Sequence, residues 1–198
     1  MIWPVILIAM VPVVSWGLWA ARPGRVLDIV VVDKTVPYPN RIEHRSLFWL
    51  LGHLRIRTAA GAPYDIDSDY IGAFPGPKPG DPPARTNDLT ADRAVRADLV
   101  YLADTYGVYR GDLLSGPLMR AALERSPKIY GGLELAEAEA AAQAVRAGKT
   151  LVAEFNTLGS PTSDHAKAAL EAALGVRWTR WIGRYLPRLE DVFEALPW

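Results

Sequence analysis

The fold is decided by the stretch Leu27-Asp28-Ile29-Val30-Val31-Val32-Asp33, a continuous β-branched run that follows a Pro-Gly breaker. Such a run is typical of a strand that is buried on both faces, and strands of this kind belong to parallel sheets. Two further apolar runs have the same character, at residues 99–103 and 150–155. The sequence therefore predicts three buried parallel strands.

Helical patterns separate and follow these strands. Apolar residues recur three or four positions apart, as on one face of a helix, within residues 41–54, 133–147 and 162–174. A helix start at Asn87-Asp88-Leu89-Thr90 precedes the second strand, and Gly148 and Gly175 stand where C-terminal caps are expected. The alternation predicts an α/β fold with a mostly parallel sheet and helices on both faces.

Residues 59–83 interrupt the alternation with six prolines and four glycines, a density that excludes a helix. Residues 64–66 fit a short strand, and residues 74–83 fit a long irregular loop. Loops of that length often act as lids or binding loops, although a solvated surface excursion fits the pattern equally well.

The composition favours one compact domain and excludes several functions. The chain has 198 residues, 22 basic and 22 acidic side chains and no cysteine. Balanced charge argues against nucleic-acid binding, which needs a basic surface. The lack of cysteine excludes a disulfide scaffold and a cysteine nucleophile. We expect no metal site and no cofactor, since His53 and His165 have no partner at metal-ligand spacing.

The first 21 residues form a separate segment, because they contain no charged side chain. An uncharged apolar run of about 20 residues has the length needed to cross a bilayer. Trp16 and Trp19 suit its interfacial belt. The segment also lacks the positive start and the cleavage site of a signal peptide. We therefore predict a transmembrane anchor at residues 1–21, with a buried core helix as the alternative.

Residues 22–198 then form the α/β domain. Its apolar end at Leu196-Pro197-Trp198 predicts that the natural chain continues. Arg22 and Arg25 are the charges nearest to the predicted anchor, and by the positive-inside rule they favour a cytoplasmic domain.

Polar side chains follow each of the three predicted strands. Ligands of open parallel sheets bind outside the carboxyl ends of the strands, so these side chains predict a ligand-binding rim. Taken singly, each also fits the capping of a loop through nearby backbone N–H groups. In chain order, the rim residues are Asp33, Lys34, Asp104, Tyr106, Glu154 and Asn156.

The predicted rim suits more than one chemistry. Tyrosine rings can cover the apolar faces of a sugar, while carboxylates and amides bind its hydroxyl groups. Two carboxylates can also act as general acid and base on a glycosidic bond, and Asp104 and Glu154 would be that pair, since they follow the clearest strands. Carboxylate oxygens can also bind a divalent cation. Spacing in the sequence does not decide between these uses.

Other candidate residues carry weaker signals. His44, near the start of a predicted helix, fits a solvent-exposed or cap-supporting histidine. Gly131-Gly132 fits a turn, because the surrounding glycines and the Lys-Ser/Thr pair of a P-loop are missing. Ser115 and Ser160 lack the nucleophile elbow of serine hydrolases. Residues 178–185 interleave cations with aromatic rings, which would suit a partner surface or packing within the domain.

Several strings together resemble an uncharacterised bacterial family of membrane-anchored proteins. The globular domain of that family resembles the class I glutamine amidotransferase-like fold. The strings are Asp33-Lys34-Thr35, Glu43-His44-Arg45-Ser46-Leu47-Phe48-Trp49, Asp104-Thr105-Tyr106-Gly107-Val108-Tyr109, Lys128-Ile129-Tyr130-Gly131-Gly132-Leu133, Glu154-Phe155-Asn156-Thr157, Ser160-Pro161-Thr162 and Gly183-Arg184-Tyr185.

This resemblance implies a flavodoxin-like sheet with a nucleophile elbow at Glu154-Phe155-Asn156. The cysteine nucleophile is missing, so amidotransferase activity is not implied. The resemblance also implies a domain outside the cytoplasm, contrary to the arginine count, and we favour the extracytoplasmic side.

Three functions remain open from the sequence. The first is a membrane-anchored ligand-binding or sensory domain for a saccharide or another envelope component, with its site at the predicted rim. The second is a hydrolase that uses Asp104 and Glu154. The third is a structural or assembly protein that binds through residues 178–185. The expected partners are therefore a membrane and a small molecule or saccharide, without nucleic acid.

Overall fold

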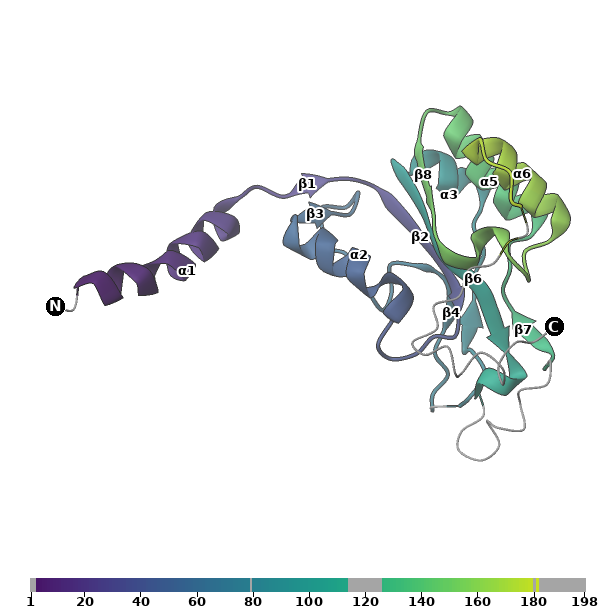
Figure 1. The fold of residues 1–198 in the computed structure, drawn as a ribbon, viewed down its shortest axis with the longest axis horizontal. Helices are drawn as coiled ribbons and strands as arrows, with labels where there is room; N and C mark the ends of the chain where they lie inside the picture. Colours follow the sequence, from purple (N-terminus) through teal and green to yellow (C-terminus); the bar gives the residue numbers. More distant parts are fainter. Residues whose placement is uncertain (1–2, 79, 114–125, 180, 182–198) are drawn as a thin grey trace.

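A computed structural model describes residues 3–78, 80–113, 126–179 and 181 (Figure 1). Its centre is a six-stranded sheet in the order β5-β4-β2-β6-β7, with β8 paired to β6. The pairs β2·β4, β2·β6 and β6·β8 are parallel, whereas β4·β5 and β6·β7 are antiparallel. The strands are β2 (Ile29–Thr35), β4 (Ile71–Phe74), β5 (Arg85–Thr86), β6 (Leu99–Tyr109), β7 (Lys128–Tyr130) and β8 (Thr150–Ala153).

The prediction of a mostly parallel, flavodoxin-like sheet is wrong, because the sheet is mixed and its antiparallel strands were not foreseen. The strand β5 has two residues and β7 has three. Strands this short bury too little surface to leave a periodic pattern in the sequence. The β4 strand was missed as well, and residues 64–66, where a short strand was considered, do not belong to a strand.

The fold prediction also included one membrane-spanning helix at residues 1–21, and no such helix is found among the described residues. Helix α1 (Trp3–Ala21) has 19 residues with Pro12 inside it, and Ser15 and Gly17 further interrupt its aliphatic run. In the part of the chain that the structure describes, no helix combines the length and the apolar character needed to cross a membrane.

The C-terminal end of α1 is tied to the rest of the molecule, from which the helix extends in Figure 1. Trp19 Nε1 donates to the carbonyl oxygen of His53 at 2.6 Å, and Arg55 Nη1 donates to that of Ala20 at 2.8 Å. A two-stranded parallel sheet of β1 (Arg25–Val26) and β3 (Ile56–Arg57) follows this junction.

Helices cover both faces of the main sheet (Figure 1). Each face of the sheet has its own hydrophobic core. On one face α2 (Ile42–His53) packs over Ile29 and Val31, and the core on the other face contains Val30 and Val32. Alternate residues of β2 therefore enter opposite cores, as the β-branched run predicts. Each such side chain stabilises the fold by about 1.5–3 kcal/mol. The helices of the second face are α3 (Ala91–Arg96), α5 (Leu135–Arg146) and α6 (Asp164–Leu174).

The helix ends confirm the capping signals in the sequence. The Ser163 hydroxyl accepts a hydrogen bond from the backbone N–H of Ala166, and Gly175 ends α6 in the left-handed conformation with φ 67°. Glu134 and Glu137 form a capping box at the start of α5. These caps satisfy backbone groups that the helix itself leaves unpaired.

A bulge in β6 determines which side chains meet at the carboxyl end of the sheet. Val32 pairs with Leu102, but the next residue, Asp33, pairs with Asp104, so β6 has one extra residue, Ala103. Without this extra residue, strict alternation would turn Asp104 towards α5. The bulge instead places it on the α2 face, beside Asp33.

Candidate functional site

Asp33 is held entirely by neighbouring protein groups. Its Oδ2 lies 2.6 Å from His44 Nδ1, and its Oδ1 accepts hydrogen bonds from the Thr35 N–H at 3.1 Å and the Thr35 hydroxyl at 2.6 Å. The residue is 5% exposed. Asp33 therefore organises the floor of the rim and leaves little capacity for direct contact with a ligand.

His44 contradicts the expectation of a solvent-exposed or cap-supporting histidine, because it is 1% exposed. Its Nε2 lies 3.2 Å from the carbonyl oxygen of Ile66, and its ring packs against Phe48 and Tyr70. Both ring nitrogens therefore face acceptors. An imidazolium, which donates from both nitrogens, satisfies Asp33 and Ile66 together. A histidine in the first turn of a helix, five residues after Pro39, gave no signal of this role in the sequence.

Lys34 lies on the opposite face from Asp33, since neighbouring residues of a strand point to opposite sides. Its Nζ is 2.6 Å from Glu137 Oε2 and 2.8 Å from Asp88 Oδ1, and it sits over the Tyr130 ring. The lysine is 2% exposed. It thus joins β2 to the start of α5 and does not share the rim with Asp33 and Asp104.

Asp104 lies beside Asp33 at the bulge and is 8% exposed. Its Oδ1 accepts from the Tyr106 N–H at 2.8 Å, and Asn156 Nδ2 lies 3.4 Å from Oδ1 and 3.5 Å from Oδ2. Burial raises the pKa of Asp104 and the negative charge of Asp33 raises it further, although the hydrogen bonds from Tyr106, Asn156 and the Thr105 backbone act against them. The bulge therefore places two buried carboxyl groups next to each other.

Glu43 is the residue that sequence reasoning missed as part of the rim. It lies in the first turn of α2 and is partly buried. Burial raises the pKa of Glu43, as do the charges of Asp33 and Asp104, against its backbone hydrogen bond and the lowering effect of His44. The available signal was its place next to His44, whose bond to Asp33 brings this turn of α2 to the end of β2.

Tyrosines and a fourth carboxylate extend the rim along β6. Tyr106 and Tyr109 have ring centroids 5.2 Å apart, and Asp112 in the 3-10 helix η1 (Arg110–Leu113) accepts from the Tyr109 N–H at 2.8 Å. Burial raises the pKa values of Tyr38, Tyr106 and Tyr109, and Asp112 raises all three further. The three hydroxyl groups therefore lie in the field of the same carboxylate.

Glu154 and Asn156, the two rim residues predicted after the third strand, have different neighbours. Glu154 is exposed and bonds the hydroxyl of Tyr101, whose pKa is raised by burial and by this carboxylate. Asn156, in the 3-10 helix η2 (Phe155–Leu158), reaches Asp104 instead. Asp104 is thus coupled to Asp33 and Glu43, while its predicted catalytic partner Glu154 is engaged with Tyr101.

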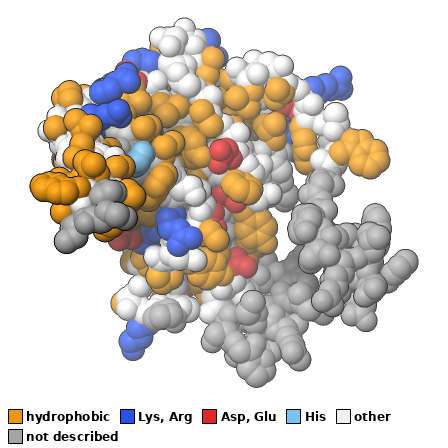
Figure 2. Space-filling view, turned by 60° about the vertical axis from the view of Figure 1, so that its left-hand side comes forward, with side chains coloured by type: hydrophobic (Ala, Val, Ile, Leu, Met, Phe, Trp, Pro, Cys, Tyr) orange, Lys and Arg blue, Asp and Glu red, His pale blue; other side chains and the backbone are white. Residues whose placement is uncertain are grey.

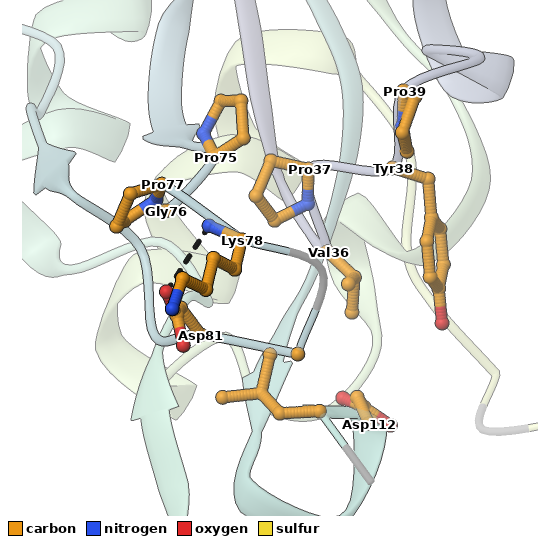
Figure 3. Close-up of a pocket in the computed structure, with 12 residues that line it drawn as sticks. Val36, Pro37, Tyr38, Pro39, Pro75, Gly76, Pro77, Lys78, Asp81 and Asp112 are labelled. Carbon is orange, nitrogen blue, oxygen red and sulfur yellow. Dashed lines mark hydrogen bonds between the residues drawn. The ribbon is translucent and has the colours of Figure 1, made fainter. Parts of the chain in front are cut away.

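A cavity of about 360 Å³ opens next to these carboxylates. Figure 3 shows Pro75 and Pro77 on one side of it and Tyr38 and Pro39 on the other. Val36 and Pro37 line both this cavity and a smaller hollow over Asp33, Glu43 and His44. The described residues that line the cavity are Val36, Pro37, Tyr38, Pro39, Pro75, Gly76, Pro77, Lys78, Gly80, Asp81, Asp112 and Leu113. The hollow is too small to hold a water molecule, so we call the cavity alone the groove.

The groove combines apolar walls with acidic groups. Four of the twelve described residues that line it are prolines, and Tyr38, which also lines it, is 48% exposed. Figure 2 shows acidic side chains among hydrophobic ones near the centre of the visible face. Part of the proline-rich loop lines this cavity, and most of the described loop residues are also exposed to solvent. Across the described ranges, no three His, Asp or Glu side chains are grouped to hold a metal ion.

The aromatic segment at residues 178–185 lies largely outside the described residues, which include 178, 179 and 181 of it. Within that part, the Trp178 N–H donates to Glu171 Oε1 at 2.7 Å, and Lys167 Nζ sits 4.6 Å from the centre of the Trp178 ring. Trp178 therefore packs on α6.

Comparisons of this chain with protein-family models, with curated proteins and with solved structures gave no match.

Proposed function

We propose that this protein binds a hydroxylated ring ligand, a saccharide, in the groove at the carboxyl end of β2 and β6. The observation that carries the proposal is the cavity of about 360 Å³, which is lined by prolines and Tyr38 and has the carboxylates of Asp81 and Asp112 in its lining. Binding sites for small molecules are concave, mostly apolar and furnished with a few polar groups.

Each part of the groove matches one property of a sugar. The half-exposed ring of Tyr38 and the neighbouring proline rings offer flat apolar surfaces to the C–H face of a pyranose. Asp81 and Asp112 line the cavity and supply acceptors for hydroxyl protons, and carboxylate acceptors form stronger hydrogen bonds than neutral ones.

The hydrolase alternative receives less support from the geometry. Glu154 bonds Tyr101, while Asp104 is coupled to Asp33 and Glu43. A binding role requires no such pair, and it uses the aromatic and proline walls that the hydrolase hypothesis leaves unexplained. We therefore propose binding without catalysis.

The test is calorimetric titration of the full chain with tetrasaccharides of three charge classes: neutral N-acetylglucosamine, cationic glucosamine and anionic galacturonic acid. We expect at least one class to bind, and Tyr38→Ala to weaken that binding about tenfold, which corresponds to about 1.4 kcal/mol. The matched control is Trp49→Ala, which removes an exposed aromatic ring on the outer side of α2. Failure of all three classes to bind, or equal loss in both variants, would overturn the proposal.

A further inference from the structure

Helix α2 carries a second apolar face that the core of the domain does not use. Its inner face buries Phe48 and Leu51 against the sheet, whereas Ile42, Trp49 and Leu50 are exposed, Trp49 by 67%. A helix that packs only on its own sheet needs one apolar stripe, with polar side chains on the other side. The exposed apolar side chains therefore suit contact with something outside the domain.

The aromatic rings of this face continue to the end of α1. The His53 ring stacks with Trp49, at a centroid distance of 5.2 Å, and with Trp19, at 6.3 Å. The Trp19 indole also donates to the His53 carbonyl oxygen, so the ends of the two helices present their apolar side chains together. We call Trp19, Ile42, Trp49, Leu50 and His53 the α2 outer face.

Positive charge is concentrated around the α2 outer face. Residues 1–27 and 44–63, which supply α1, β1, β3 and most of α2, contain five arginines and no Asp or Glu, although the whole chain has no net charge. Arg22, Arg25 and Arg45 are exposed, and none of the five forms an ion pair with a described residue. On the face seen in Figure 2, hydrophobic side chains gather on the left, with basic side chains beside them.

This combination matches the surface of a bilayer that contains anionic lipids. Helices that lie on a membrane bury Trp and Leu side chains at the level of the headgroups and place Arg or Lys beside them. Anionic headgroups attract such basic residues. A second copy of this chain fits less well, because a symmetric interface would bring the same five arginines together from both copies. Charge complementarity therefore favours lipid over self-association.

We infer that the α2 outer face docks on the surface of a membrane that contains anionic phospholipids. The docking requires no segment that crosses the bilayer. It is also independent of the proposed saccharide binding, because the groove is lined by other residues, at the carboxyl end of β2 and β6.

Sedimentation of the full chain with lipid vesicles tests the charge preference. We expect binding to phosphatidylcholine vesicles with about 30% phosphatidylglycerol to be at least about tenfold tighter than binding to pure phosphatidylcholine vesicles. The preference should shrink as salt rises from about 0.05 to about 0.5 M, because salt screens exposed charges. Arg45→Gln should reduce it several-fold. The matched control is Arg146→Gln, at an exposed position of α5 on the other side of the sheet, which should leave it unchanged.

A single fluorescent label shows which face contacts the lipid. The chain has no cysteine, so Leu50→Cys accepts one environment-sensitive fluorophore, and Gln143→Cys on α5 provides the control position. On addition of the anionic vesicles, the emission of the label at position 50 should shift to shorter wavelength and be quenched by brominated lipid. The label at position 143 should not respond. Both positions are exposed, and circular dichroism checks that each labelled variant keeps the fold.

Three results would contradict the inference. A label at position 50 that stays in water while the chain sediments with vesicles would show that α1 attaches by itself. A shift of the same label without vesicles, growing with protein concentration, would show that a second copy covers the face. Equal binding to both kinds of vesicle, or equal losses in Arg45→Gln and Arg146→Gln, would remove the role of the arginines. None of these results would affect the proposed saccharide binding.

Discussion

Removing the His44 imidazole strips the buried Asp33 carboxylate of its closest partner. His44 Nδ1 lies 2.6 Å from Asp33 Oδ2, and the two side chains are 1% and 7% exposed. Breaking a buried ion pair by removing one partner costs about 3–5 kcal/mol, because the remaining charge stays in a poorly solvated site. His44→Ala also leaves a hollow against Phe48 and Tyr70, which adds to the loss. We therefore expect the free energy of unfolding to fall by at least about 3 kcal/mol.

Urea denaturation of the full chain, followed by circular dichroism, measures this loss. In a thermal melt, the same loss should lower Tm by about 6–12 °C, since each kcal/mol shifts a domain of this size by about 2–4 °C. The control is Arg96→Ala, which breaks the exposed ion pair with Asp92 and should cost less than about 0.5 kcal/mol.

The double variant Asp33→Ala/His44→Ala isolates the charge contribution. It removes both members of the pair, so no buried charge remains unpaired, and its loss should be smaller than the sum of the two single losses. A His44→Ala loss below about 1 kcal/mol, or losses that add without coupling, would refute the assignment of this pair as a buried ionic contact.

Three more predictions follow from the packing and charges of the site. Glu137→Ala should destabilise the full chain by about 3–5 kcal/mol in urea, since it leaves buried Lys34 without its 2.6 Å partner; an equal loss in the exposed neighbour Glu139→Ala would contradict this. Burial and neighbouring charges raise the pKa values of Glu43 and Asp104. Above the ordinary carboxyl pKa of about 4, the folded state therefore binds more protons than the unfolded state. Stability then falls as the pH rises through the raised pKa values. Between about pH 4 and about pH 7, Tm should therefore decrease less for Glu43→Gln than for the unaltered chain. Parallel plots of Tm against pH would show that Glu43 does not contribute to this decrease. Gly72→Ala should cost more than about 3 kcal/mol, because at φ 151° its Cβ would lie 1.6 Å from the Asp33 carbonyl oxygen. Gly61→Ala, at φ 80° in open space, should cost about 1–2 kcal/mol, so similar losses in the two variants would count against close packing at Gly72.

The sequence predicted the long, regular elements well because each carries a periodic signal. The β-branched run around Val31 forms the central strand, and the apolar stripes at residues 133–147 and 162–174 form α5 and α6 within one or two residues. The short strands β5 and β7 carry no such signal. Their antiparallel pairing depends on how a proline-rich loop and a later segment return to the sheet, and the prediction of a mostly parallel sheet failed there.

The sequence also predicted only some of the residues of the candidate site. Asp33 and Asp104 were predicted from their places after two strands, and the structure pairs them on adjacent strands. The role of His44 and the position of Glu43 were missed, because only the packing of α2 on the sheet brings its first turn to the end of β2. Lys34 was assigned to the same rim, yet it points to the other face.

The amino-acid sequence alone determined where strands and helices form, because hydrophobic periodicity and capping residues act over a few neighbouring positions. It also determined that no cysteine takes part in any chemistry here. Only the tertiary structure decided which polar side chains share a face. One extra residue, Ala103, turns Asp104 towards Asp33, and the proline-rich loop closes a cavity beside them. Both effects depend on the register between strands distant in sequence, which no local pattern encodes.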